Sequence, residues 1–289
     1  RQGHDVAIRQ PQDEAPIYLS PGWTGTDPDI HCVHSQLNMS AYFDGKPRVM
    51  FMHGEPISSV GNGISMKAIV DLAPKMDAFI CMRRDELIVW NSIKRTYLVQ
   101  KGVDLEMFHP IADASTERLS GEPAVLYIEN WRGQRNPLYP IIAMQEYYKR
   151  NPKARLHLYN CNDPKMSETF KALATTCKWW PFLRSLQGRV NGPVEVNALI
   201  NRADIVISGL YPLYARGVEA FGAGRGYIGA GYRENDYPYQ CELQPESMAA
   251  AIEKMWSEWG GYDFRKLAEE HHDANRSAAQ CVDVYRRFL

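Results

Sequence analysis

The sequence predicts an α/β protein with parallel sheets, arranged as two domains. Short apolar runs of strand type alternate with longer segments of helical period, which is typical of parallel strands joined by helices. The runs form two similar sets with a polar stretch between them. The chain of 289 residues is long enough for two cores of moderate size, since single cores stop growing near ~250–300 residues.

The first set of strands lies in the first third of the chain. Its runs are short and mostly apolar, and residues 66–73 have a helical pattern before the last of them. The predicted strands are residues 5–8 (DVAI), 30–33 (IHCV), 48–52 (RVMFM) and 78–81 (AFIC).

The second set begins after the polar stretch. Its predicted strands are residues 124–128 (AVLYI), 155–159 (RLHLY), 205–208 (IVIS) and 227–230 (YIGA). Asn-Pro pairs mark both ends of the first helical segment, and Gly260-Gly261 separates the other two. The predicted helices are residues 137–150, 245–259 and 264–289.

The stretch between the two sets, residues 109–123, has few apolar side chains and several small or turn-forming ones. This composition is typical of an exposed linker between domains. We therefore place the domain boundary in this stretch.

The composition excludes several classes of protein. With 33 basic and 34 acidic residues the net charge is -1, so no overall positive field favours nucleic acid. The longest stretch without Asp, Glu, Lys or Arg, residues 30–43, is too short for a transmembrane segment. Six cysteines without a CxxC pair argue against a zinc ribbon or a disulfide scaffold and favour a reducing cytoplasm.

Three motifs follow one another along the chain. They are KGVDLEMFHP at 101–110, LYIENWRGQRNP at 126–137, and the strand 203–208 with GVEAFGAG at 217–224. In this order and at these separations they resemble the family 4 glycosyltransferases, which have the GT-B fold. In the first motif only the leading Asn is replaced, by Lys101.

The resemblance implies two Rossmann-like domains with parallel sheets facing a central cleft. Residues 1–112 would form the acceptor-side domain and residues 118–272 the nucleotide-sugar-binding domain. The last helix, 273–289, would return to the first domain. The chain would lack the usual first strand and first helix of that domain.

The basic loop after residue 128 carries the predicted diphosphate site. Transfer of a sugar from a nucleoside diphosphate leaves negative charge on the β-phosphate, which fixed cations and N–H donors stabilise. The resemblance places Arg135 where the family has Lys and Asn130 where it has Arg, with Arg132 as a replacement. The alternative is that both arginines are solvated loop charges.

The acidic motif of the family is a Glu pair, and its second member matches Glu219. A carboxylate can accept two hydrogen bonds from the ribose diol. The alternative is a carboxylate that stabilises a helix N-terminus. The first Glu is replaced by Tyr211 and a nearby Gly by Tyr214. The segment also adds Pro212 and Leu213 to the predicted donor site.

His53 and His34 follow strand-like runs, and parallel sheets bind ligands at the carboxyl ends of strands. The resemblance places His53 beside the donor sugar, and Gly54 leaves room for the backbone to approach a ligand. The alternative for each His is a structural role. A weaker match, QGRV at 187–190, adds Arg189 and Val190 to the donor site.

The resemblance implies hexosyl transfer from a nucleoside diphosphate sugar to a glycan, lipid or small-molecule acceptor, with retention of configuration and without a metal or cofactor. The sequence favours a cytoplasmic location, with attachment to a membrane surface as the alternative. A non-catalytic nucleotide-sugar-binding protein would explain Tyr211 and Asn130. A nicotinamide oxidoreductase would need a dinucleotide-binding fingerprint that follows a strand and opens a helix. The chain does not have one in that place, because GRGYIG at 224–229 precedes a strand.

Overall fold

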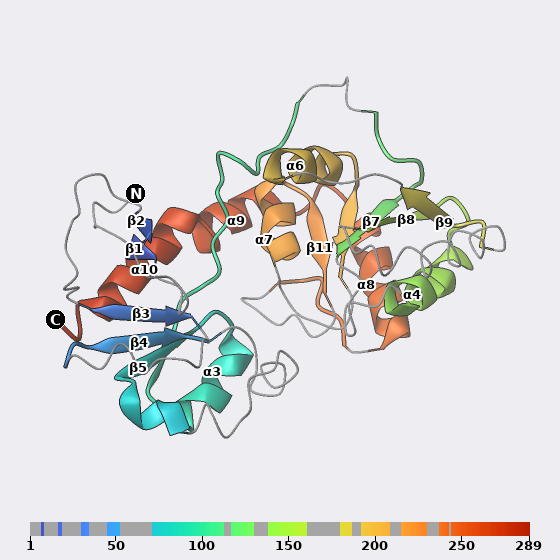
Figure 1. Cartoon of the computed structure of the whole chain (residues 1–289). Coiled ribbons are helices and arrows are strands. Elements are labelled where there is room, and N and C mark those ends of the chain that lie inside the picture. The colour runs from blue at the N-terminus through green and yellow to red at the C-terminus, as the bar shows by residue number, and fades with distance from the viewer. Residues whose placement is uncertain are drawn as a thin grey trace. The chain divides into compact units, whose positions relative to one another are not determined.

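The computed structural model describes residues 7–8, 17–18, 30–34, 45–52, 71–112, 117–129, 138–160, 180–186, 192–208, 215–229, 237–242 and 244–289. The chain divides into two compact units (Figure 1), residues 1–102 together with 274–289, and residues 103–273. No helix in these described ranges is long and apolar enough to span a bilayer.

The first unit contains a parallel sheet in the order β3 (His31–His34), β4 (Arg48–Phe51), β5 (Ala78–Cys81) and β6 (Thr96–Leu98). Side chains of β5 alternate between the two faces of the sheet. Phe79 packs edge to face with Trp90 of α3 (Arg84–Asn91). Ile80 belongs to the cluster that contains Val284 of α10 (Ala274–Tyr285). Because both of its faces are covered, β5 consists of apolar residues throughout.

The structure corrects two sequence predictions in this unit. Residues 5–8 were expected in the parallel sheet, but β1 (Ala7–Ile8) pairs antiparallel with β2 (Ile17–Tyr18) in a ladder of its own. An antiparallel pair needs only a short connection, whereas a parallel pair needs a crossover. The strand β6 is also not predicted, because its three residues follow Lys94 and Arg95 and form no apolar run.

The second unit contains a five-stranded parallel sheet in the order β11-β10-β7-β8-β9. The strands are β7 (Ala124–Glu129), β8 (Arg155–Asn160), β9 (Leu183–Leu186), β10 (Ile205–Ile207) and β11 (Gly226–Ile228). The helices are α4 (Leu138–Tyr148), α6 (Pro193–Asn201), α7 (Ala215–Gly222), α8 (Pro245–Ser257) and α9 (Phe264–His271).

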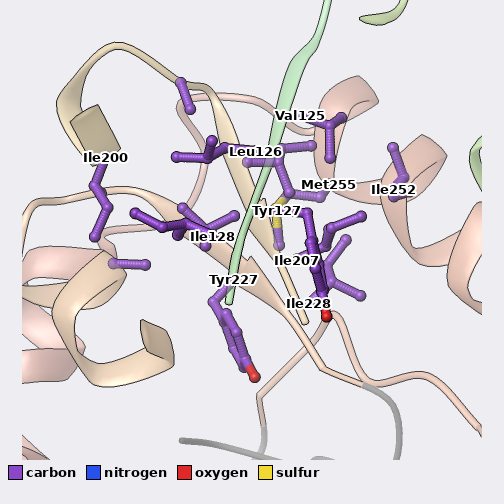
Figure 2. Close-up of a cluster of buried hydrophobic side chains, with 14 of the residues drawn as sticks. Val125, Leu126, Tyr127, Ile128, Ile200, Ile207, Tyr227, Ile228, Ile252 and Met255 are labelled. Atoms are coloured by element: carbon purple, nitrogen blue, oxygen red, sulfur yellow. The ribbon is translucent and has the colours of Figure 1, made fainter. Parts of the chain in front are cut away.

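The core of this unit is built around β7, its central strand. Residues 124–128 are completely buried. Figure 2 shows Leu126 on the side of Ile200, from α6, and Val125 on the side of Ile252, from α8. A central parallel strand with helices on both faces has no polar face, which explains the uninterrupted apolar run at this position.

The second half of the predicted exposed linker is mostly exposed, but Leu119 and Pro123 are buried, so the prediction is wrong at these two residues. Leu119 is buried, and its N–H donates to Arg202 O at 2.9 Å. The buried Asp204 carboxylate accepts hydrogen bonds from the N–H of Ala124 at 2.8 Å and from Arg118. Backbone groups make most of these contacts, so the segment is held against the sheet without any apolar periodicity.

The helical pattern predicted over 264–289 is interrupted. Between α9 and α10, the N–H of Val103 donates to His272 O at 2.7 Å, and Val103 forms a parallel bridge with Asp273. Residues 272–273 therefore pair with the segment that contains Val103 and do not continue the helix. The periodicity alone contains no signal for this break.

His157 on β8 makes the stability of the second unit dependent on pH. It is 3% exposed, and its Nε2 donates to Ser120 O at 2.7 Å. Burial lowers the pKa of His157, and Arg184, Arg202 and Arg155 lower it further, while the hydrogen bond to Ser120 opposes them. The unfolded chain therefore binds this proton more readily, and the free energy of unfolding should fall as the pH drops below about 6.5.

Urea unfolding of the parent and of His157→Gln at about pH 7.5 and about pH 5.5 measures this effect. We expect the parent to lose more stability than the variant between the two pH values, because the Gln side chain does not titrate. Identical losses would show that other groups govern the acid side of the stability profile.

Candidate functional site

The sheet of the second unit reverses its strand order between β7 and β10. From β7 the chain continues to β8 and β9 on one side, and then returns to β10 and β11 on the other. In open α/β sheets, ligands bind outside the carboxyl ends of the strands at such a switch point. Because Ile207 pairs with Tyr127 in a parallel register, both strands end at the same edge.

The connections that leave this edge contain most of the predicted donor residues. Residues 130–137 follow β7 and precede α4, and residues 209–214 lie between Ser208 and α7. The topology therefore connects both predicted loops to the switch point. The candidates that lie outside the described residues are Asn130, Arg132, Arg135, Arg189, Val190, Tyr211, Pro212, Leu213, Tyr214, His53 and Gly54.

Glu219 is a predicted donor residue that the structure does describe. It is the fifth of the eight residues of α7, and the first turn of this helix contains no acidic side chain. The alternative role at a helix N-terminus is therefore wrong. The side chain is 14% exposed, and its Oε2 accepts a hydrogen bond from Arg216 Nη1 at 2.5 Å.

The ion pair with Arg216 suits a carboxylate that binds a diol. The hydrogen bond from Arg216 goes to Oε2, and no other hydrogen bond of the Glu219 side chain is found among the described residues. Within that part of the chain Oε1 keeps its lone pairs for a hydroxyl ligand, while Arg216, three residues earlier on the same helix, restricts the side chain. Arg216 was not among the predicted site residues, although its position three residues before Glu219 is visible in the sequence.

Ser208 and Tyr227 support the carboxyl end of β10. The hydroxyl groups of these two buried residues lie 2.6 Å apart, and the N–H of Ser208 donates to Ile228 O at 3.0 Å. Tyr237 OH donates in turn to Tyr227 O at 2.5 Å. The point where the chain leaves β10 toward α7 is therefore fixed by hydrogen bonds as well as by packing.

The supporting role of Ser208 and Tyr227 could not be predicted from the sequence. Tyr227 was correctly placed in a buried strand, but a buried tyrosine has no pattern that identifies the partner of its hydroxyl. Only the pairing of β10 with β11, at Val206 and Tyr227, brings the two residues together.

The two candidate histidines, His34 and His53, belong in the sequence to two neighbouring strands of the first unit, as the last residue of β3 and shortly after β4. The parallel register of β3 and β4 pairs His34 with Phe51, two residues before His53. The backbone thus brings β3 and the end of β4 to the same sheet edge, while His53 itself lies outside the described residues. Within the ranges that the structure describes, no group of three or more His, Cys, Asp or Glu side chains could hold a metal ion.

The second unit has the topology of a doubly wound α/β sheet with a switch point, and comparison with solved structures identifies the fold of most of the chain. Sucrose-phosphate synthase from Thermosynechococcus elongatus matches with a TM-score of 0.70 at 16% identity, over 90% of this chain and 73% of that one. Anabaena HepE in complex with UDP matches with a TM-score of 0.70 at 12% identity, over 89% of this chain and 79% of that one.

A glycosyltransferase from Rickettsia africae matches with a TM-score of 0.65 at 14% identity, over 90% of this chain and 77% of that one. No protein-family model and no curated protein sequence matches the chain. The structural neighbours are GT-B glycosyltransferases, so the predicted GT-B fold with parallel sheets is confirmed. Membership of family 4, and the domain boundaries that it implies, stay predictions.

Proposed function

We propose that the protein is a glycosyltransferase that moves a sugar from a nucleoside diphosphate sugar to an acceptor. The observation that carries this proposal is the position of Glu219 on α7, the helix that follows β10 at the switch point of the second sheet. The HepE structures support the choice of donor, since they are complexes with UDP and with UDP-glucose. The order of the three sequence motifs supports it independently.

In the proposed mechanism the protein binds the donor and stabilises the leaving group. Glu219 accepts hydrogen bonds from the ribose hydroxyls, and Arg216 holds its carboxylate in position through a hydrogen bond to Oε2. Arg135 and Arg132 neutralise the charge that develops on the diphosphate. Tyr211 takes the place of a carboxylate next to the sugar, and the motif resemblance gives His53 a contact with the same sugar.

The finer parts of the proposal rest on the motif resemblance. They are hexosyl transfer, retention of configuration, independence of a metal and a cytoplasmic location. A retaining reaction without a metal would place the leaving phosphate next to the acceptor hydroxyl, so that position and electrostatics, rather than a protein base, supply most of the rate enhancement.

A non-catalytic nucleotide-sugar-binding protein is the second candidate function, and Tyr211 favours it because a tyrosine cannot supply the negative charge of the family's Glu. Incubation with a panel of nucleoside diphosphate sugars separates the two candidates. A transferase should be stabilised against heat by its donor and should release the nucleoside diphosphate. Stabilisation without release would support the second candidate, and neither effect would contradict both.

Replacing Glu219 by Ala should weaken the binding of nucleoside diphosphate by about 1–3 kcal/mol, because the ribose diol would lose its acceptor. Calorimetric titration measures this loss. Glu246→Ala is the matched control, since Glu246 is an exposed carboxylate in the first turn of α8. Equal affinities of the parent and Glu219→Ala would remove Glu219 from the site.

A further inference from the structure

The guanidinium group of Arg265, on α9, binds backbone carbonyls from two separate segments. Its Nη1 donates to Gly222 O at 2.6 Å and to Phe108 O at 2.7 Å, and both Nη atoms lie 3.3 Å from Leu105 O. Its Nε donates to Glu269 Oε1 at 2.8 Å. Arg265 thereby connects the segment 103–110 to the last residue of α7.

The carboxyl-terminal end of α7 needs such a partner. The N–H of Gly224, at φ +69°, donates to Phe221 O at 2.9 Å, and the N–H of Arg225 donates to Ala220 O at 2.8 Å. This pair of bonds is a Schellman motif and satisfies two of the last carbonyls of the helix. Arg265 takes the carbonyl of Gly222, and its positive charge complements the negative end of the helix dipole.

Close packing joins the same two segments. A Cβ atom on Gly222 would lie 3.0 Å from Phe108 Cβ and 3.1 Å from Phe108 O, and one on Gly224 would lie 3.2 Å from Pro110 Cγ. No side chain therefore separates the end of α7 from the segment 103–110. The end of α7 follows the position of this segment, and Arg265 fixes the two together.

Glu219 is three residues before Gly222, or about 4.5 Å along the helix axis. A shift of the helix end therefore moves the carboxylate by a similar amount, and a misplacement of about 1 Å can strongly reduce binding and rate. We propose that Arg265 is a positioning residue for donor recognition, which sets the place of Glu219 through the carboxyl-terminal end of α7. This inference rests on the proposed function, because Glu219 is taken to bind the donor ribose.

The test compares the affinity for a nucleoside diphosphate with that for its 2′,3′-dideoxy analogue, which lacks the diol. The parent should bind the nucleoside diphosphate about tenfold more tightly than the dideoxy analogue. Arg265→Met should bring the preference close to one, and Arg265→Lys, which keeps the charge without the planar fork, should restore part of it. Arg150→Met is the control, since Arg150 is half exposed and pairs with Glu253 on the surface.

A second measurement does not depend on any ligand. In the unliganded protein, Arg265→Met should speed amide hydrogen exchange in the segments 103–110 and 219–225 and leave β7 unchanged. If Arg265→Met does not fold, both measurements are made on Arg265→Lys. Parent-like exchange in these segments would overturn the proposal, and so would faster exchange with an unchanged preference for the diol, because Arg265 would then be merely structural. If the parent binds no nucleoside diphosphate, the proposed function fails and a role in donor positioning fails with it, while faster exchange would still show that Arg265 fixes the end of α7.

Discussion

Replacing Arg135 by Ala is expected to lower the rate of sugar transfer about 10²–10³-fold, because one aimed donor to a developing oxyanion contributes about 2.7–4 kcal/mol to the barrier. Arg135 belongs to the segment that leaves the carboxyl end of β7, the central strand at the switch point. A guanidinium group in this segment can bind two phosphate oxygens at once. The rate of nucleoside diphosphate release from the donor measures the effect.

Binding experiments separate this role from a general loss of structure. Arg135→Ala should weaken a nucleoside diphosphate far more than the plain nucleoside, because only the diphosphate carries the charge. Arg150→Ala removes a guanidinium from the surface of the same unit and should leave both affinities unchanged. Equal losses for the two ligands in Arg135→Ala would count against a diphosphate contact.

Replacing Phe221 by Ala is expected to lower the free energy of unfolding by about 3–5 kcal/mol, because it leaves a cavity in a rigid core. Phe221 is completely buried on α7. Its ring packs edge to face with Tyr227 and Tyr237, at centroid distances of 6.0 and 5.4 Å, and stacks on Phe264 at 6.3 Å. The phenyl ring therefore joins the helix of Glu219 to β11 and α9.

Unfolding in urea measures this loss. Val194→Ala is the control, because Val194 on α6 is 67% exposed and should change the free energy of unfolding by no more than about 0.5 kcal/mol. Phe221→Leu should fall between the two, since it keeps most of the apolar volume. A loss for Phe221→Ala no larger than that of the control would mean that the aromatic cluster around α7 adjusts without a cavity.

The parts of the fold that the sequence predicts are those in which burial shows directly in residue type. Residues 124–128 form an unbroken apolar run because helices cover both faces of β7, and the prediction of a strand there is confirmed. The strand β6 follows two charged residues and forms no apolar run, and the run at residues 5–8 predicts a strand there without indicating its antiparallel partner β2. Their pairing depends on neighbouring strands, so it could not be predicted from local pattern.

The candidate site shows the same division. Glu219 is a candidate because its motif, a carboxylate in a Gly-rich segment after an apolar strand, is visible in the sequence, and its role in donor binding stays a prediction. The role of Arg265 could not be predicted, since its side chain binds backbone carbonyls up to 160 residues away, and carbonyls do not depend on residue type. The hydroxyl pair of Ser208 and Tyr227 is hidden for a similar reason, because only the strand register brings it together.

The most direct test of the account is amide hydrogen exchange with and without a saturating nucleoside diphosphate. Binding at the switch point should slow exchange in the segments that follow β7 and β10, residues 129–137 and 208–219, and this protection should shrink in Glu219→Ala. Segments at the amino ends of the strands, such as 117–124, should exchange at the same rate with and without ligand. Protection confined to those amino ends, or no protection by any nucleoside diphosphate, would contradict a donor site at the carboxyl ends of β7 and β10.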